Sequence, residues 1–176
     1  EVQADGSSLV GTVLSDSGIH WTSGGGSQTL PPGGTYPLSR ASSISDDGYV
    51  IAGFSQDANW GRATAWQGGT PMLLDYLPGY TQQWSHANGV AGNGSLIVGD
   101  SSSASGRYVA CTWALDGSVQ ALPQQIGSSA ACAASRDGAV IVGRQGGGGY
   151  YNESTSYPCR WDDRQLTVLP VLSYSV

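Results

Sequence analysis

The chain has 176 residues, of which only 11% are charged, and all seven basic residues are arginines. Its formal net charge of −6 argues against a nucleic-acid partner, because binding to phosphates needs clustered basic residues that release counterions. The same charge argues against attraction to an anionic membrane surface, and no apolar run approaches the roughly 18 residues of a membrane-spanning helix.

One pattern of residues occurs four times along the chain. Each copy has, in order, an Asp-Gly or Asn-Gly turn, a short apolar run ending in glycine, a tryptophan and a Leu-Pro pair. The turn glycines Gly6, Gly48, Gly94 and Gly138 are 42, 46 and 44 residues apart, and a period of this size is typical of solenoids and propellers. The repeat tryptophans are Trp21, Trp66, Trp113 and Trp161, and the closing leucines are Leu30, Leu77, Leu122 and Leu169. We expect these residues to build the scaffold, since a regular pattern favours packing over ligand contact.

Each copy is predicted to consist of β-strands. In the second copy the expected strands are residues 41–45, 49–53, 63–66 and 71–74, with a turn at 46–48, a variable loop at 54–61 and a turn at 67–69. The Asp-Gly turn favours an antiparallel hairpin of type I′, and four antiparallel strands in a unit of this size describe a propeller blade. The sequence therefore predicts an all-β, four-repeat β-propeller in one domain, residues 1–176, with repeats at about 1–36, 37–82, 83–126 and 127–170.

The repeat is incomplete at its beginning and over-long at its end. Aligning Gly6 with Gly48 leaves the first copy without most of its leading strand, whereas residues 171–176 continue beyond the fourth Leu-Pro pair. We therefore expect the leading strand of the first blade, at Glu1 and Val2, to be completed by the tail residues Leu172, Ser173, Tyr174, Ser175 and Val176. The tail acts either within its own chain, which closes a monomeric ring, or on the next chain, which makes a head-to-tail polymer. The chain has no initiator Met, and we expect Glu1 to be the first residue of a processed or shortened chain.

The three cysteines lack the spacing of a zinc site. Cys111 and Cys159 hold equivalent positions two residues before a repeat tryptophan, so the sequence favours a disulfide of Cys132 with Cys111 or Cys159 over one between those two. Three buried thiols are the alternative. Asn152 and Asn93 each begin a sequon for N-glycosylation, although Asn93 also belongs to a turn.

One stretch of the second copy matches a known repeat family. It runs from Ala41 through Ile44, Asp47 and Gly48 to Gly53, and it is followed by Ala63-Thr64-Ala65-Trp66. These residues resemble the HAF repeat of bacterial extracellular proteins, which occurs in autotransporters and surface-anchored proteins. The other copies match more loosely, and together the resemblance covers nearly the whole chain. It implies a β-propeller-like fold and secretion or display at the cell surface, and it brings no catalytic residues.

Two tryptophans break the repeat pattern. Trp60 lies in the variable loop of the second copy, and Trp84 lies in the connection before the third. Loop insertions in repeat proteins gather on one face, which is often the binding face. With Tyr108, Tyr150 and Tyr151 these tryptophans form an aromatic population that suits contact with a protein or a sugar, and packing within the loops is the alternative.

The sequence offers no spacing typical of catalysis. There is no G-x-S-x-G motif, and the paired aspartates at 46–47 and 162–163 do not form the ligand-dense loop that calcium prefers. We therefore expect no catalytic, cofactor-binding or metal-binding residues and no membrane insertion. The expected function is a non-enzymatic extracellular structural protein that polymerises head to tail, by C-terminal strand donation, into a surface filament. The alternative is a monomeric propeller that acts as a lectin-like or protein-binding module through its loop aromatics.

Overall fold

The computed structural model describes residues 1–3, 5–14, 16–79, 84–102, 107–146 and 156–170. These ranges contain fifteen strands in four antiparallel sheets. They contain no helix, and hence none long and apolar enough to cross a membrane. The predicted all-β fold of four repeated units is confirmed.

Each sheet is a meander in which consecutive strands lie side by side. The first consists of β1 (Ser8–Val13), β2 (Ser17–Thr22) and β3 (Gly26–Thr29). The second consists of β4 (Leu38–Ile44), β5 (Val50–Gln56), β6 (Gly61–Gln67) and β7 (Thr70–Leu73). The third consists of β8 (Ser85–Val90), β9 (Ile97–Ser102), β10 (Tyr108–Trp113) and β11 (Val119–Ala121). The fourth consists of β12 (Ser128–Ala134), β13 (Val140–Gly146), β14 (Ser156–Asp162) and β15 (Gln165–Val168).

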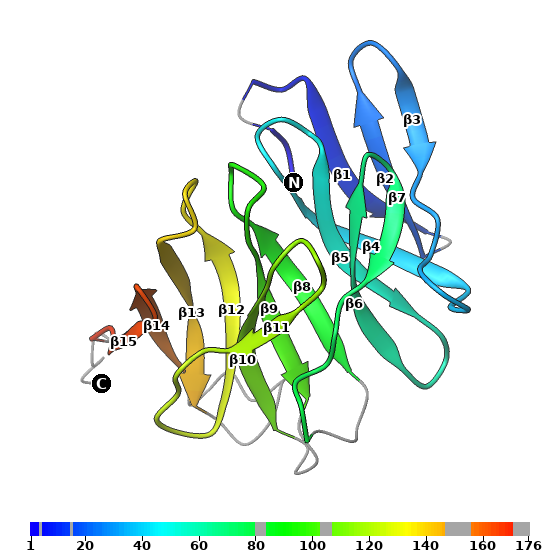
Figure 1. Ribbon diagram of the computed structural model, residues 1–176. Coiled ribbons are helices and arrows are strands. Elements are labelled where there is room, and N and C mark those ends of the chain that lie inside the picture. Colours follow the sequence, from blue (N-terminus) through cyan, green and yellow to red (C-terminus); the bar gives the residue numbers. More distant parts are fainter. Residues whose placement is uncertain (4, 15, 80–83, 103–106, 147–155, 171–176) are drawn as a thin grey trace, which may run out of the picture.

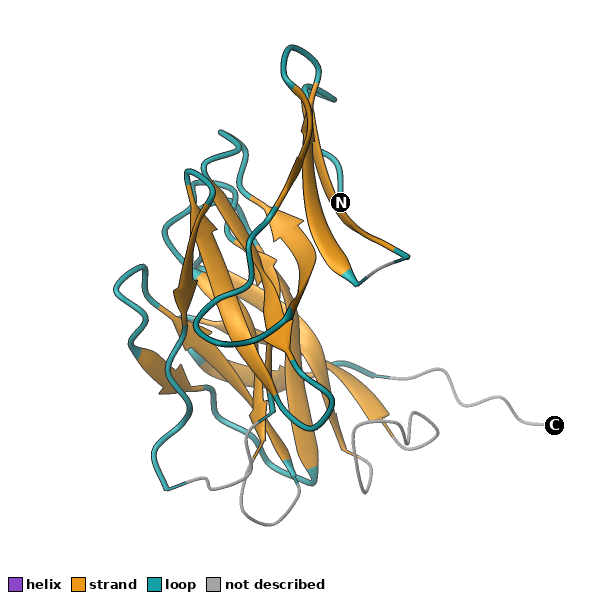
Figure 2. Ribbon diagram, turned by 90° about the vertical axis from the view of Figure 1, so that its right-hand side faces the viewer, coloured by secondary structure: helices purple, strands orange, loops and turns teal. Residues whose placement is uncertain are grey.

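The sheets follow one another in sequence order. Figure 1 shows the first and fourth sheets on opposite sides of the molecule, with the other two between them, and the turned view in Figure 2 shows strands and loops only. Three apolar clusters hold the array together, each between two consecutive sheets and each containing one fully buried repeat tryptophan. Among the described residues no cluster joins the first sheet to the fourth, so this part of the chain forms an open array.

The four Asp-Gly and Asn-Gly turns differ from the predicted type I′ geometry. Type I′ needs positive φ at both central residues, but in all four turns only the glycine has it, with φ between 70° and 76°. In the second sheet the N–H of Gly48 donates to the carbonyl of Ser45, and the carboxylate of Asp47 accepts from the Ser45 hydroxyl and the Tyr49 N–H. Two consecutive positive φ angles occur instead in the turn between β6 and β7, with 56° at Gly68 and 84° at Gly69, and in the turn between β14 and β15, with 43° at Asp163 and 65° at Arg164.

In the second, third and fourth sheets the glycine that ends the apolar run lies against a bulge in the neighbouring strand. The pairing of β4 with β5 slips between Ala41 and Ser43, and β8 and β12 slip at the same place. A Cβ on Gly53 would lie 1.9 Å from the carbonyl oxygen of Arg40. Gly99 and Gly143 face the same approach, at 1.9 and 2.1 Å. The close backbone contact therefore explains why the runs of these three sheets end in glycine, whereas a Cβ on Gly11, in the first sheet, would meet no atom within 4 Å.

The closing leucine of the second unit is Leu74, and the prediction of Leu77 was wrong. In the other three sheets the closing leucine donates its N–H to the residue three positions before the repeat tryptophan. In the second sheet Leu74 makes this bond, to the carbonyl of Ala63 at 2.9 Å. Residues 75–77 are an insertion that moves the Leu-Pro pair away from the structural position.

Residues 1–3 lie beside β1, in the place of a leading strand. Val2 forms an isolated antiparallel bridge with Leu9, and the backbones of Glu1 and Val10 exchange two hydrogen bonds of 2.9 Å. The first sheet therefore begins with only a short leading segment. The tail predicted to complete that segment, residues 171–176, lies outside the described residues.

Candidate functional site

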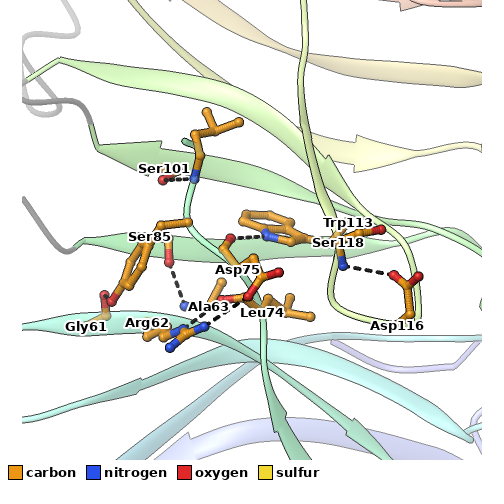
Figure 3. Close-up of polar contacts among 12 residues, drawn as sticks. Gly61, Arg62, Ala63, Leu74, Asp75, Ser85, Ser101, Trp113, Asp116 and Ser118 are labelled. Atoms are coloured by element: carbon orange, nitrogen blue, oxygen red, sulfur yellow. Dashed lines mark hydrogen bonds and ion pairs between the residues drawn. The ribbon is translucent and has the colours of Figure 1, made fainter. Parts of the chain in front are cut away.

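The second, third and fourth sheets each bind the preceding one through their repeat tryptophan. At the junction of the second and third sheets, Trp113 Nε1 donates to the carbonyl of Asp75 at 2.7 Å (Figure 3). Trp66 and Trp161 make the same bond, to Pro31 and Pro123, at 2.7 and 2.8 Å. Each acceptor directly follows a closing leucine, and leucine and tryptophan share one apolar cluster at every junction.

A serine in the leading strand of each later sheet accepts a second bond. The hydroxyl of Ser85 accepts the N–H of Ala63 at 2.9 Å (Figure 3). Ser39 and Ser129 accept in the same way from the first and third sheets, at 3.1 and 2.9 Å. All three donors stand three residues before a repeat tryptophan. In the fourth sheet this position is Pro158, which has no N–H to donate.

A third bond comes from the linker that follows each closing leucine. One backbone N–H of each linker donates to a side chain of the next sheet, at 2.9 to 3.5 Å. This side chain belongs to the residue two positions after the apolar-run glycine. The acceptors are Ser55, Ser101 and Gln145, all of them buried. In the first sheet the equivalent residue is Val13, which cannot accept.

The fourth sheet exposes the face that the second and third sheets bury. Val142 is 42% exposed, whereas Ala52 and Val98, at the same position, are fully buried. Leu169 is 37% exposed, whereas the closing leucines of the other sheets are at most 2% exposed. Cys132 and Pro158 are exposed as well. We call Cys132, Val142, Pro158 and Leu169 the outer face of the fourth sheet.

The first sheet exposes the opposite half of such a junction. Leu9 pairs with Trp21 as Ile51 pairs with Trp66, but Leu9 and Trp21 are only partly buried. Val13, 41% exposed, and the partly buried Ile19 lie on the same side, because alternate residues of a strand point the same way. We call Leu9, Val13, Ile19 and Trp21 the front face of the first sheet. In the second, third and fourth sheets all of the equivalent residues are buried.

Aromatic side chains gather around the start of β8. The ring of His86 stacks on Trp84, with centroids 5.8 Å apart, and meets Phe54 edge-on at 5.0 Å. Tyr108 lies 6.1 Å from the same ring. Trp60, 41% exposed, is adjacent to Gly61, which forms a bridge with Trp84. The structure therefore brings together three of the predicted contact residues, and Tyr150 and Tyr151 lie outside the described residues.

A buried carboxylate adjoins this aromatic cluster. Asp100 is fully buried, with Oδ1 3.1 Å from His86 Nδ1 and Oδ2 accepting from Asn88 Nδ2 at 2.9 Å. Asn88 also donates to the carbonyl of Ala131, in the fourth sheet. Both carboxylate oxygens have partners, so the group fastens the third sheet to the fourth. Sequence reasoning missed Asp100, because it follows an apolar run without any motif.

The described residues offer little for catalysis or metal binding. Ser8 Oγ and His20 Nε2 lie 2.5 Å apart, and burial lowers the pKa of His20, which favours the neutral ring. Among the described residues no carboxylate is hydrogen-bonded to His20, so the pair lacks the group that orients the imidazole in a Ser-His-Asp triad. The same ranges contain no group of three or more His, Cys, Asp or Glu residues that could hold a metal ion.

The cysteines are free thiols, so the predicted disulfide is not formed in this structure. Cys111 is buried in the third sheet, and β13 lies between the strands that carry Cys132 and Cys159. Cys132 is the exposed thiol. Asn93 is exposed in its turn, where its Oδ1 accepts from the N–H and hydroxyl of Ser95 at 2.9 and 2.7 Å. Asn152 lies outside the described residues.

Comparison with known proteins shows the fold. No protein-family model and no curated protein sequence matches the chain. A putative TolB from Agrobacterium tumefaciens matches with a TM-score of 0.71 at 15% identity, over 99% of this chain and 61% of that one. TolB from Acinetobacter baumannii gives 0.67 at 14% identity, over 96% and 42%, and the tricorn protease gives 0.58 at 11%, over 96% and 18%.

The chain therefore spans less than two thirds of the length of these proteins. At such low identities the likeness shows the fold alone. The four antiparallel sheets match the β-propeller domains of TolB and the tricorn protease.

Proposed function

We propose that the chain is a non-enzymatic structural module that assembles head to tail with further copies of itself. The observation that carries this proposal is the exposure of Val142 and Leu169, at positions that the second and third sheets bury. The terminal units of repeat proteins usually present a polar outer face, which keeps them soluble. Here the front face of the first sheet exposes Leu9, Val13, Ile19 and Trp21 in part. The outer face of the fourth sheet exposes Val142 and Leu169 beside Arg160 and Arg144, which pair across strands with Val142 and Pro158. A contact between two different faces of identical chains forms rings or filaments.

An extracellular or cell-surface location fits this role. The resemblance to the HAF repeat supports it, since that repeat occurs in secreted and surface-anchored bacterial proteins. The absence of lysine and the low content of charged residues suit a durable fibre that resists proteases. Secretion is tested by fractionating the source cells and locating the chain with an antibody.

Sedimentation velocity and electron microscopy of the intact chain test the assembly. We expect species larger than a monomer whose share rises with concentration and which form linear or ring-shaped arrays. A monomer at every soluble concentration would overturn the proposal. Removing residues 171–176 then tests strand donation by the tail: the assembly dissociates if the tail joins the copies and persists if another contact does.

A second candidate function is binding of a glycan or a protein at the aromatic cluster. The exposed Trp60 beside Trp84, His86 and Tyr108 favours it, because aromatic rings offer a large contact area at low entropic cost. Trp60→Ala and Trp84→Ala should weaken binding on a glycan array, whereas Ile126→Ala, at another exposed apolar residue, should not. Binding of the intact chain to no glycan and to no surface protein removes this candidate.

A further inference from the structure

We infer that copies join by packing the outer face of the fourth sheet of one chain on the front face of the first sheet of the next. This inference rests on the proposed head-to-tail assembly and identifies the surfaces that form it. The contact is a fourth junction of the kind that the chain already makes three times within itself.

The internal junctions define what such a contact requires. At the junction of the third and fourth sheets, Leu122 and Val98 pack with Ile141 and Trp161 in one cluster. The first two residues belong to the outer side of one sheet, and the last two form a cross-strand pair on the front of the next. Val142 and Leu169, on the fourth sheet, hold the same positions as Val98 and Leu122. Leu9 and Trp21, on the first sheet, hold the same positions as Ile141 and Trp161 and form the same cross-strand pair.

The hydrogen bond of the repeat tryptophan is available as well. The Trp21 indole has no hydrogen-bond partner among the described residues. The acceptor of each internal bond is the carbonyl that follows a closing leucine, and after Leu169 this is the carbonyl of the exposed Pro170. Trp21 of one copy therefore meets Pro170 of another in the arrangement that joins Trp161 to Pro123.

Differences between the ends and the internal faces favour a second copy as the partner. Ser39, Ser85 and Ser129 each accept an N–H from the preceding sheet. If a sheet with such a serine packed on the fourth sheet, the serine hydroxyl would be buried against Pro158, which has no N–H to donate. The front face of the first sheet carries four apolar side chains, and Ser17, Thr29 and Ser27 pair across strands with Val13, Ile19 and Trp21. It has Val13 and Ile19 where the second sheet has the hydrogen-bonded pair Ser55 and Thr64. The described part of the first sheet has neither this serine nor the Ser55–Thr64 pair, so it suits the face around Pro158 better than an internal sheet does.

Charge sets the conditions under which the contact forms. Each copy carries a net charge of −6, so copies repel one another at low ionic strength. Arg160 pairs across strands with Val142 and forms an exposed ion pair with Asp162, so the outer face itself carries this ion pair. Association should therefore tighten as salt is added, because screening weakens the repulsion and leaves the apolar contact.

Two aspartate variants test the contact. Val13→Asp alters only the front face and Val142→Asp only the outer face. Both positions are about two-fifths exposed, so each monomer should keep its fold, as checked by circular dichroism. Either change places a carboxylate in an apolar contact and should weaken self-association by about a hundredfold or more. The control is Ile126→Asp, at a residue that is 51% exposed and belongs to neither face, and it should assemble like the unaltered chain.

Mixing the two variants gives the sharpest readout. The Val142→Asp chain retains an intact front face and the Val13→Asp chain an intact outer face, so together they should form one junction and a 1:1 dimer. Failure of the mixture to dimerise, or loss of association in only one of the variants, overturns a contact between these two different faces.

The same series separates this inference from the proposed function. If the Val142→Asp chain still assembles and removal of residues 171–176 dissociates it, the face contact is overturned and head-to-tail assembly stands. If the intact chain is monomeric throughout, both are overturned. Alkylation of Cys132 provides a second measure, since the exposed thiol should react at least tenfold more slowly in the assembly than in the Val13→Asp monomer.

Discussion

Replacing Trp161 by Phe should destabilise the monomer far more than the same change at Trp21. Trp161 is fully buried, and its Nε1 donates to the carbonyl of Pro123 at 2.8 Å. Losing that donor removes a hydrogen bond to the carbonyl of Pro123, an exposed residue, at a cost of about 0.5–1.5 kcal/mol. The smaller ring leaves a cavity of roughly 40 Å³, which at about 24 cal/mol per Å³ adds about 1 kcal/mol. The sum is about 1.5–2.5 kcal/mol. Trp21 is partly exposed and has no such bond among the described residues, so its replacement should cost less than about 1 kcal/mol.

Urea unfolding of dilute monomer, followed by circular dichroism, measures both values. The change in midpoint multiplied by the slope of the transition gives each loss of stability. Equal losses at Trp161 and Trp21, or a loss below about 0.5 kcal/mol at Trp161, would refute the role of the indole bond at the junctions. At concentrations where copies associate the order should change, because Trp21 then becomes a contact residue.

The remaining predictions concern the backbone, the turns and the thiols. Gly53→Ala should prevent stable folding, because its Cβ would lie 1.9 Å from a carbonyl oxygen, whereas Gly11→Ala, with no atom within 4 Å, should leave the melting temperature nearly unchanged. Hydrogen bonds from the Ser45 hydroxyl and then the Tyr49 N–H lower the pKa of Asp47, so the stability that this carboxylate contributes is present above its ordinary pKa and is lost as pH falls through the lowered value. The Asp47→Asn variant should therefore lose less stability than the parent on acidification from about pH 5 to pH 2, as measured by thermal melting. Titration with a thiol reagent should label only Cys132 in the native monomer and all three cysteines in denaturant; fast labelling of all three without denaturant would contradict the burial of the other two.

Much of the fold follows from residues that recur at fixed places. The apolar-run glycines and the tryptophans of the second, third and fourth sheets are each required by one local contact, and that contact is the same in all three sheets. Gly53, Gly99 and Gly143 all face a bulge carbonyl, and Trp66, Trp113 and Trp161 all donate to the preceding sheet. A sequence pattern can predict such contacts, because each is made by a single residue type.

Other features depend on the three-dimensional arrangement of the strands, which no short sequence motif predicts. Leu77 precedes a proline and looks like a closing leucine, yet the hydrogen bond to Ala63 belongs to Leu74. Asp100 is buried because His86 and Asn88 converge on it from β8, and an isolated aspartate in a sequence gives no sign of this. The two end faces were also missed as surfaces. Val142 and Leu169 occupy regular positions of the repeat in the sequence. Only the arrangement of the sheets shows that the described part of the chain leaves them exposed.

In the described part of the chain each sheet packs only on the sheets next to it in the sequence, and this packing determines the order in which the sheets unfold. The second and third sheets each take part in two apolar clusters, whereas the first and fourth take part in one. Thermal fluctuations should therefore release the ends first, and the first sheet most readily, since its leading segment, residues 1–3, is held by an isolated bridge at Val2 and by a few hydrogen bonds of Glu1 and Gln3. Amide hydrogens should exchange fastest in β1 to β3 and slowest in the middle of the array. A copy added at an end would turn a fraying sheet into an interior one, so growth of the assembly and resistance to unfolding would increase together.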